Sequence, residues 1–145
     1  MKILVINGPN LNLLGIREPN IYGADTLSDI ENWINNELKN QNIKLQWYQS
    51  NHEGKILDRL HRAMNDKSDG IIINPGAYTH YSYAIRDAIS AISIPTVEVH
   101  ISDIKSREKF RQASVIQDVC LEQISGLGKN GYLKAVYTLE KYFNR

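Results

Sequence analysis

Residues 1–23 read MKILVINGPNLNLLGIREPNIYG, in which a short apolar run passes directly into a polar loop bounded by glycines. A continuous apolar run such as 3–6 is typical of a strand buried on both faces of a parallel sheet. The loop that follows carries three side chains capable of chemistry, namely Arg17, Glu18 and Tyr22. A segment that only joins two elements does not need this set, so we expect the loop to act as a mobile lid over a site.

The same arrangement repeats along the chain, with apolar runs separated by segments of helical periodicity. We expect strands at residues 3–6, 44–49, 70–74, 96–101 and 119–124. Helical segments lie between them, including a short one after Ser102 and a last one over residues 132–143. Five strands alternating with five helices in a single domain, residues 1–145, predict a flavodoxin-like open α/β sandwich. Its five-stranded parallel sheet should have the order 2-1-3-4-5, with helices on both faces.

The composition argues against several classes of protein. With 145 residues and a formal net charge of +1, the chain has no bulk field to attract nucleic acid or an anionic membrane. No apolar run approaches the roughly 20 residues of a membrane span, and the first residues lack the pattern of a secretory signal. The single cysteine, Cys120, allows no internal disulfide. We therefore expect a cytoplasmic protein with no nucleic-acid or membrane partner.

Polar side chains gather where the expected strands end. Ligands of open α/β sheets bind beyond the carboxyl ends of the strands, where the strand order reverses, which here is between the first and third strands. The polar residues at these ends include Asn10, Asn74, His80, Glu98, His100 and Ser102. We expect the functional site to form around them.

Glu98 and His100 lie two residues apart, so a strand places both side chains on one face. This spacing could serve a metal, but a carboxylate that orients an imidazole for proton transfer explains it with fewer parts. The four histidines show no H-E-x-x-H spacing, and one cysteine cannot form a thiolate cluster, so we expect no metal. A buried structural histidine is the other interpretation of His100.

Arginines after the fourth strand are expected to meet the tyrosine of the loop. Arg107 and Arg111 are four residues apart on the short helix expected there, so both can face one way. Most arginines are solvated surface residues, and most loop tyrosines are not bases. Guanidinium groups beside Tyr22, supplied by Arg17 and Arg107, would nevertheless favour its phenolate and make it a base at neutral pH.

Three alternative functions find less support. Residues 126–131, GLGKNG, fit the dinucleotide pattern G-x-G-x-x-G, but no strand and acidic residue follow at the required distance, which favours a tight turn. A Schiff-base lysine lacks an apolar pocket, because Lys105 and Lys109 lie on a charged segment and Lys2 lies at the far end of the first strand. A receiver or flavin-binding module would need acidic residues or a Ser/Thr-rich loop where NGPNLNLLG stands, and it remains the alternative outside the enzymes.

Three stretches, INGPNLNLLGIREPNIYG, NPGAYTHYSYAIRDA and VEVHISDIKSREKFR, resemble in order the motifs of type II 3-dehydroquinase, the 3-dehydroquinate dehydratase of the shikimate pathway. The resemblance covers nearly the whole chain. It implies that Tyr22 abstracts a proton, with Arg17 as the lid arginine beside it. It also implies that His100 is the general acid with Glu98 as its partner, and that Asn10 positions a water at the enolate oxygen.

The resemblance further implies which residues hold the substrate, 3-dehydroquinate. The matching positions are Asn74, His80, Ile101, Ser102 and Arg111. Asp87 matches a residue that reaches the site of a neighbouring subunit, since the family forms homododecamers built from trimers. Arg107 and Glu18 would support the lid, and no cofactor is implied. Asp103 and Lys105 stand where asparagine and histidine are common in the family, outside the matched catalytic set.

Overall fold

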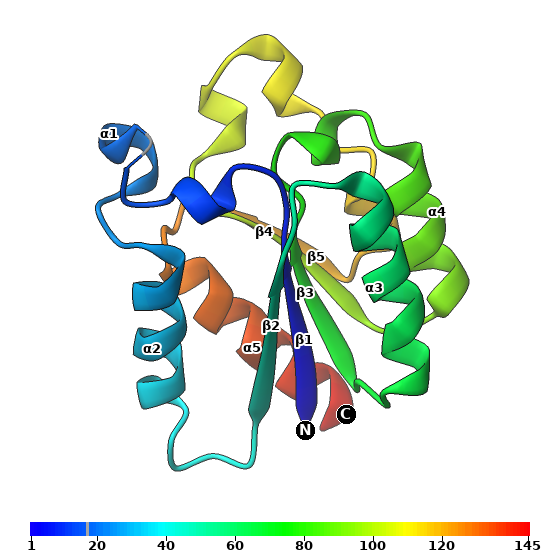
Figure 1. The fold of residues 1–145 in the computed structure, drawn as a ribbon. Helices are drawn as coiled ribbons and strands as arrows, with labels where there is room; N and C mark the ends of the chain where they lie inside the picture. The colour runs from blue at the N-terminus through cyan, green and yellow to red at the C-terminus, as the bar shows by residue number, and fades with distance from the viewer. Residues whose placement is uncertain (17) are drawn as a thin grey trace.

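The computed structural model describes residues 1–16 and 18–145. Its centre is a five-stranded sheet in the order β2-β1-β3-β4-β5, as predicted (Figure 1). The strands are β1 (Lys2–Asn7), β2 (Lys44–Gln49), β3 (Gly70–Asn74), β4 (Thr96–His100) and β5 (Glu122–Ser125). Every neighbouring pair runs parallel, so all five carboxyl ends lie at the same edge of the sheet.

Four long helices cover the two faces of this sheet, which gives the predicted flavodoxin-like sandwich (Figure 1). One face packs against α2 (Leu27–Glu37) and α5 (Asn130–Phe143), and the other packs against α3 (Glu53–Asn65) and α4 (Tyr83–Ile92). The sequence encodes their starts: Thr26 and Asp29 form a reciprocal cap at α2, and Ser82 caps α4. Each face therefore has its own apolar core. No helix among the described residues is both long and apolar enough to cross a membrane.

The alternation of side chains along β4 explains why a polar site can form in a buried strand. Val97 and Val99 join the core on the α2 and α5 side, whereas Glu98 and His100 point toward the opposite face. The side chain of Glu98 is 0% exposed and that of His100 is 5% exposed. Buried groups of this polarity are tolerated only when neighbouring donors and acceptors satisfy them.

The carboxyl ends of β1 and β3 touch through their backbones. The N–H of Gly8 donates to the carbonyl oxygen of Asn74 at 2.7 Å. A Cβ atom added at Gly8 would lie 2.5 Å from the carbonyl oxygen of Pro75, closer than real Cβ contacts allow. Gly76 has a φ of 60°, which favours glycine, and its added Cβ would lie 3.0 Å from the carbonyl oxygen of Pro9. Glycine at both positions lets the two strand ends meet.

The segment after Ser102 differs from the sequence prediction. The single short helix expected after Ser102 is instead a pair of 3-10 helices, η3 (Ile104–Ser106) and η4 (Lys109–Gln112). The side chain of Asp103 accepts from the N–H of Lys105, a local bond that competes with a regular α-helix, and Arg107 between the two turns has an extended backbone.

The last strand and the last helix also begin at other residues than expected. A 3-10 turn, η5 (Gln117–Val119), occupies the start of the expected fifth strand, so β5 begins only at Glu122. Helix α5 begins at Asn130, two residues before the predicted start. A four-residue helix, α1 (Pro19–Tyr22), lies within the segment expected to be a loop. These shifts leave the topology unchanged.

Candidate active site

A pocket of about 200 Å³ opens at the carboxyl edge of the sheet, where the strand order reverses. Its lining comes from the segments that follow β1, β3 and β4 and from α1, which are far apart in the sequence. The structure brings most of the predicted site residues together in this lining. They are Asn10, Tyr22, Asn74, His80, His100, Ile101, Ser102, Arg107 and Arg111.

Tyr22 and Arg107 form the pair that joins α1 to the segment after β4. The Nη1 atom of Arg107 donates to the Tyr22 hydroxyl at 2.8 Å, and the guanidinium carbon lies 5.2 Å from the centre of the ring. Nη1 also lies 3.3 Å from the Ser102 hydroxyl, and Nη2 lies 4.0 Å from the carboxylate of Glu18. The Arg107 side chain is only 11% exposed, so its charge acts on the phenol with little screening by water.

His100 and Glu98 form the second charged pair of the site. Nε2 of His100 lies 3.4 Å from Oε1 of Glu98, an ion-pair distance that is longer than an ordinary hydrogen bond. Burial alone would raise the pKa of Glu98, but the adjacent His100 and the hydroxyls of Ser114 and Thr79 outweigh burial and hold that pKa below its usual value. Glu98 is therefore an anion beside the imidazole, as the same-face spacing predicted.

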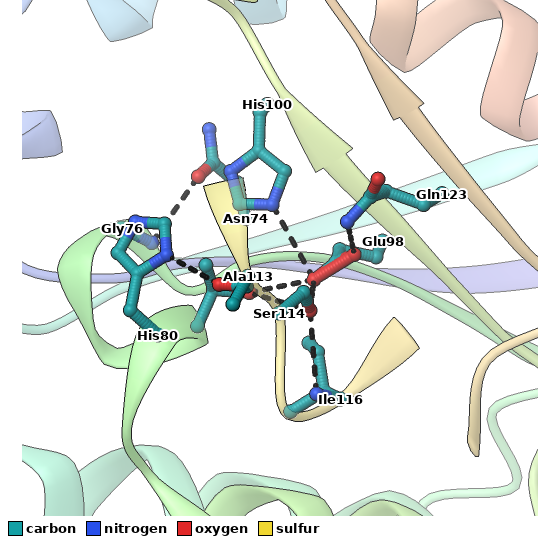
Figure 2. Close-up of polar contacts among 10 residues, drawn as sticks. Asn74, Gly76, His80, Glu98, His100, Ala113, Ser114, Ile116 and Gln123 are labelled. Atoms are coloured by element: carbon teal, nitrogen blue, oxygen red, sulfur yellow. Dashed lines mark hydrogen bonds and ion pairs between the residues drawn. The ribbon is translucent and has the colours of Figure 1, made fainter. Parts of the chain in front are cut away.

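Three neutral donors surround the Glu98 carboxylate, as Figure 2 shows for Ser114 and Gln123. The Thr79 hydroxyl donates to Oε1 at 2.6 Å, and the Ser114 hydroxyl donates to the same oxygen. The side-chain amide of Gln123 donates to Oε2 at 2.6 Å. Sequence reasoning missed all three residues, because they come from η2 (Gly76–His80), a loop and β5.

His80 and Arg111 both line the pocket, and the positive charge of Arg111 acts on the His80 imidazole. A carbonyl can only accept, so Nδ1 of His80 donates to the carbonyl oxygen of Ala113 at 2.8 Å (Figure 2). Burial lowers the pKa of His80, reinforced by the charges of His100 and Arg111, despite the opposing bond to Ala113. Arg111 is anchored by Nε donation to the Glu108 carboxylate. The pocket is therefore lined by the neutral imidazole of His80 and by the guanidinium of Arg111, which Glu108 holds in place.

A fully buried tyrosine fixes the orientation of Asn74. Nδ2 of Asn74 donates to the Tyr132 hydroxyl at 3.1 Å, and Tyr132 in turn donates to the side-chain oxygen of Asn7. The side-chain oxygen of Asn74 accepts from the N–H of Gly76 at 3.2 Å. Both ends of the Asn74 amide are therefore defined, so the residue presents one face to the pocket. Tyr132 lies on α5, and nothing in its local sequence indicated this role.

Asn10 has the left-handed backbone conformation, with a φ of 69°. Its N–H donates to the side-chain oxygen of Asn51 at 3.0 Å, and that oxygen also accepts from Nε2 of Gln49 at 3.2 Å. Asparagine tolerates this conformation better than most residues, and the bond to Asn51 holds it there. The end of β2 thus supports a pocket that it does not line.

The glycine turn at residues 126–128 also supports the pocket. The N–H of Gly126 donates to the carbonyl oxygen of Ser102 at 3.1 Å, and the N–H of Gly128 donates to that of Ile101 at 3.1 Å. Both glycines have positive φ, as a tight turn requires. The turn predicted for GLGKNG is confirmed, and it anchors the backbone of two pocket residues.

The remaining predicted residues lie elsewhere. Asp87 is exposed on α4 and is absent from the lining of the pocket, so its role in a neighbouring subunit stays a prediction. Glu18 immediately precedes α1, and its carboxylate lies 4.0 Å from Nη2 of Arg107. Arg17 falls outside the described residues. Lys105 and Lys109 are exposed. Across residues 1–16 and 18–145, no group of three or more potential metal ligands gathers.

Comparisons with known proteins show which family the chain resembles. The family model described as dehydroquinase class II matches residues 1–140. A 3-dehydroquinate dehydratase of Caldicellulosiruptor saccharolyticus is 57% identical over 140 residues, which cover 97% of each chain. The structure of a type II dehydroquinase from Butyrivibrio crossotus is 56% identical, with a TM-score of 0.94 over 97% of each chain. That of a type II dehydroquinase from Propionibacterium acnes is 38% identical, with a TM-score of 0.89 over 96% of each chain.

Proposed function

The chain belongs to the class II dehydroquinase family and is a 3-dehydroquinate dehydratase of the shikimate pathway, and from this premise we propose how its residues divide the reaction. The substrate is a β-hydroxy ketone that carries a carboxylate. Loss of water removes a proton beside the ketone and expels the β-hydroxyl, so it needs one base and one acid. The observation that carries the proposal is that a phenol beside a guanidinium and an imidazole beside a carboxylate line one pocket.

Tyr22 is the base of the first step. Its hydroxyl accepts a hydrogen bond from Arg107 at 2.8 Å, and a charged donor of this kind favours the phenolate. Arg17, which lies outside the described residues, is proposed to add a second positive charge when the lid closes. The phenolate takes the proton, and the electron pair of the broken C–H bond moves to the ketone oxygen to form an enolate.

His100 is the acid of the second step. Because Nε2 faces Glu98, Nδ1 is the ring nitrogen left to give a proton to the departing hydroxyl. As the enolate electrons return to form the C=C bond, the C–O bond breaks and water leaves. The Glu98 carboxylate stabilises the protonated imidazole before this transfer and fixes its orientation.

The other pocket residues hold the substrate and stabilise charge. The proposed role of Asn10 is to position a water that donates to the enolate oxygen. Arg111 supplies a fixed cation for a substrate with a carboxylate, and the substrate-holding role is also proposed for Asn74, His80 and the backbone of Ile101 and Ser102.

Two measurements test these assignments. Mixing the protein with 3-dehydroquinate should produce the ultraviolet absorbance of a conjugated enone carboxylate. In D₂O, Tyr22→Phe should abolish exchange of the proton beside the ketone, whereas His100→Ala should still permit some exchange while blocking loss of water. Exchange that continues at the native rate in Tyr22→Phe would mean that another group is the base.

We further propose that the protein works in the cytoplasm as a homododecamer built from trimers, in which Asp87 reaches the site of the adjacent subunit. The exposed position of Asp87 on α4 supports this role. Sedimentation velocity gives the oligomeric state directly, and Asp87→Ala should weaken substrate binding. A fully active monomer would overturn the assembly proposal and leave the chemistry of the pocket untouched.

A further inference from the structure

We propose that Gln123 is a positioning residue for the acid step, because it holds the far oxygen of Glu98 and so keeps the near oxygen directed at His100. The inference rests on the proposed function, in which His100 protonates the leaving hydroxyl. Gln123 does not line the pocket, so its effect on the reaction must pass through Glu98.

The sheet register places Gln123 beside the carboxylate. β4 and β5 are neighbouring parallel strands, and Gln123 is the register partner of Glu98. Register partners in neighbouring strands point to the same face, so the two side chains emerge side by side. The amide Nε2 donates to Oε2 of Glu98 at 2.6 Å, and Figure 2 shows it reaching the carboxylate from the side away from the Ser114 contact.

The two carboxylate oxygens have different surroundings. Oε1 accepts from two hydroxyls, those of Thr79 and Ser114, and is the oxygen that faces His100 at 3.4 Å. Among the described residues, Gln123 is the one side chain that donates to Oε2. Without Gln123, the carboxylate could rotate, and a buried anionic oxygen would lose its donor.

The hydrogen bonds to Glu98 influence whether the proton of His100 moves to the leaving hydroxyl or to the carboxylate. A carboxylate that accepts three neutral hydrogen bonds is a weak base, so it can stabilise a protonated imidazole without taking its proton. Loss of the Gln123 amide would make Glu98 a stronger base and loosen its position. His100 would then give its proton less readily to the leaving hydroxyl, whereas proton removal by Tyr22 would continue.

The test uses Gln123→Met, which keeps the length of the side chain and removes the amide. We expect kcat for loss of water to fall at least about tenfold, the scale of one hydrogen bond to a charged group, with KM within about twofold of the native value. In D₂O, mass spectrometry of recovered 3-dehydroquinate should show a higher ratio of exchange to elimination than in the native protein. Gln117→Met, an exposed glutamine in η5, is the matched control and should match the native protein.

Further variants separate positioning from general damage. If Gln123→Met does not fold, Gln123→Asn replaces it, since the shortened amide keeps its polarity but withdraws from Oε2. Adding Gln123→Met to Glu98→Gln should cause no further loss, because both act on one step.

The outcomes are decisive in each direction. A kcat within about twofold of native, or a lowered kcat with an unchanged ratio of exchange to elimination, overturns the inference. His100→Ala serves as the reference: if it raises the ratio and Gln123→Met does not, the proposed acid stands and the inference alone fails. If the native protein does not dehydrate 3-dehydroquinate, the proposed function fails and the inference falls with it.

Discussion

Replacing Arg107 by methionine tests whether its guanidinium makes Tyr22 a base. The substitution keeps an unbranched side chain over the ring and removes one charged hydrogen bond of 2.8 Å from a side chain that is 11% exposed. A hydrogen bond to a charged group contributes about 1.5–3 kcal/mol, which corresponds to a loss of roughly 10- to 150-fold in kcat at neutral pH.

The assay is the initial rate of enone absorbance at saturating 3-dehydroquinate and neutral pH. Arg62→Met, at an exposed arginine on α3, is the matched control and should keep the native kcat. The reasoning is refuted if Arg107→Met retains kcat within about twofold of the native value at neutral pH.

Three further predictions concern the supports of the pocket. Tyr132→Phe leaves the buried Asn7 and Asn74 side chains short of a partner, so denaturant unfolding should show a loss of about 1–3 kcal/mol, with a higher KM. Asn51→Ala removes the acceptor that holds Asn10, so kcat should fall severalfold with the melting temperature nearly unchanged, and an unaltered kcat would contradict the support role. The pKa of His80 is lowered by burial from 6.5, so the unfolded chain binds a proton first on acidification. The contribution of His80 to the free energy of unfolding should be complete above pH 6.5 and should decrease as the pH falls from 6.5 through the folded-state pKa. His80→Gln should remove this contribution to the slope of the free energy of unfolding against pH.

The strand order and most of the pocket residues could be predicted from the sequence, because both follow from local patterns. Apolar runs mark buried strands, and the rule for open parallel sheets then locates the ligand edge, where Asn74 and His100 stand. The two-residue spacing of Glu98 and His100 predicts that both side chains lie on one face of β4, where the structure has them 3.4 Å apart.

The missed residues depend on relationships that no local pattern encodes. Gln123 meets Glu98 through the register of two strands that are 25 residues apart, and Tyr132 meets Asn7 across 125 residues. The spacing of the segment after Ser102 predicts a helix, but the side chain of Asp103 accepts a hydrogen bond from the N–H of Lys105 and tightens the turn. Such local hydrogen bonds determine the conformation of short segments, whereas long amphipathic helices are stabilised mainly by the packing of their apolar face.

The close approach of the backbones at Gly8 and Pro75 fixes the distance between the ends of β1 and β3 at one wall of the pocket. Neither strand end can move inward, because the backbones already touch, and a side chain at Gly8 would force them apart. Directed evolution toward rings of another size should therefore collect its changes on the opposite wall, in α1 and around η3 and η4, and leave Gly8 and Gly76 unaltered. The ends of β1 and β3 therefore fix the spacing of one wall of the pocket, and adaptation to another substrate is left to the side chains of the other lining segments.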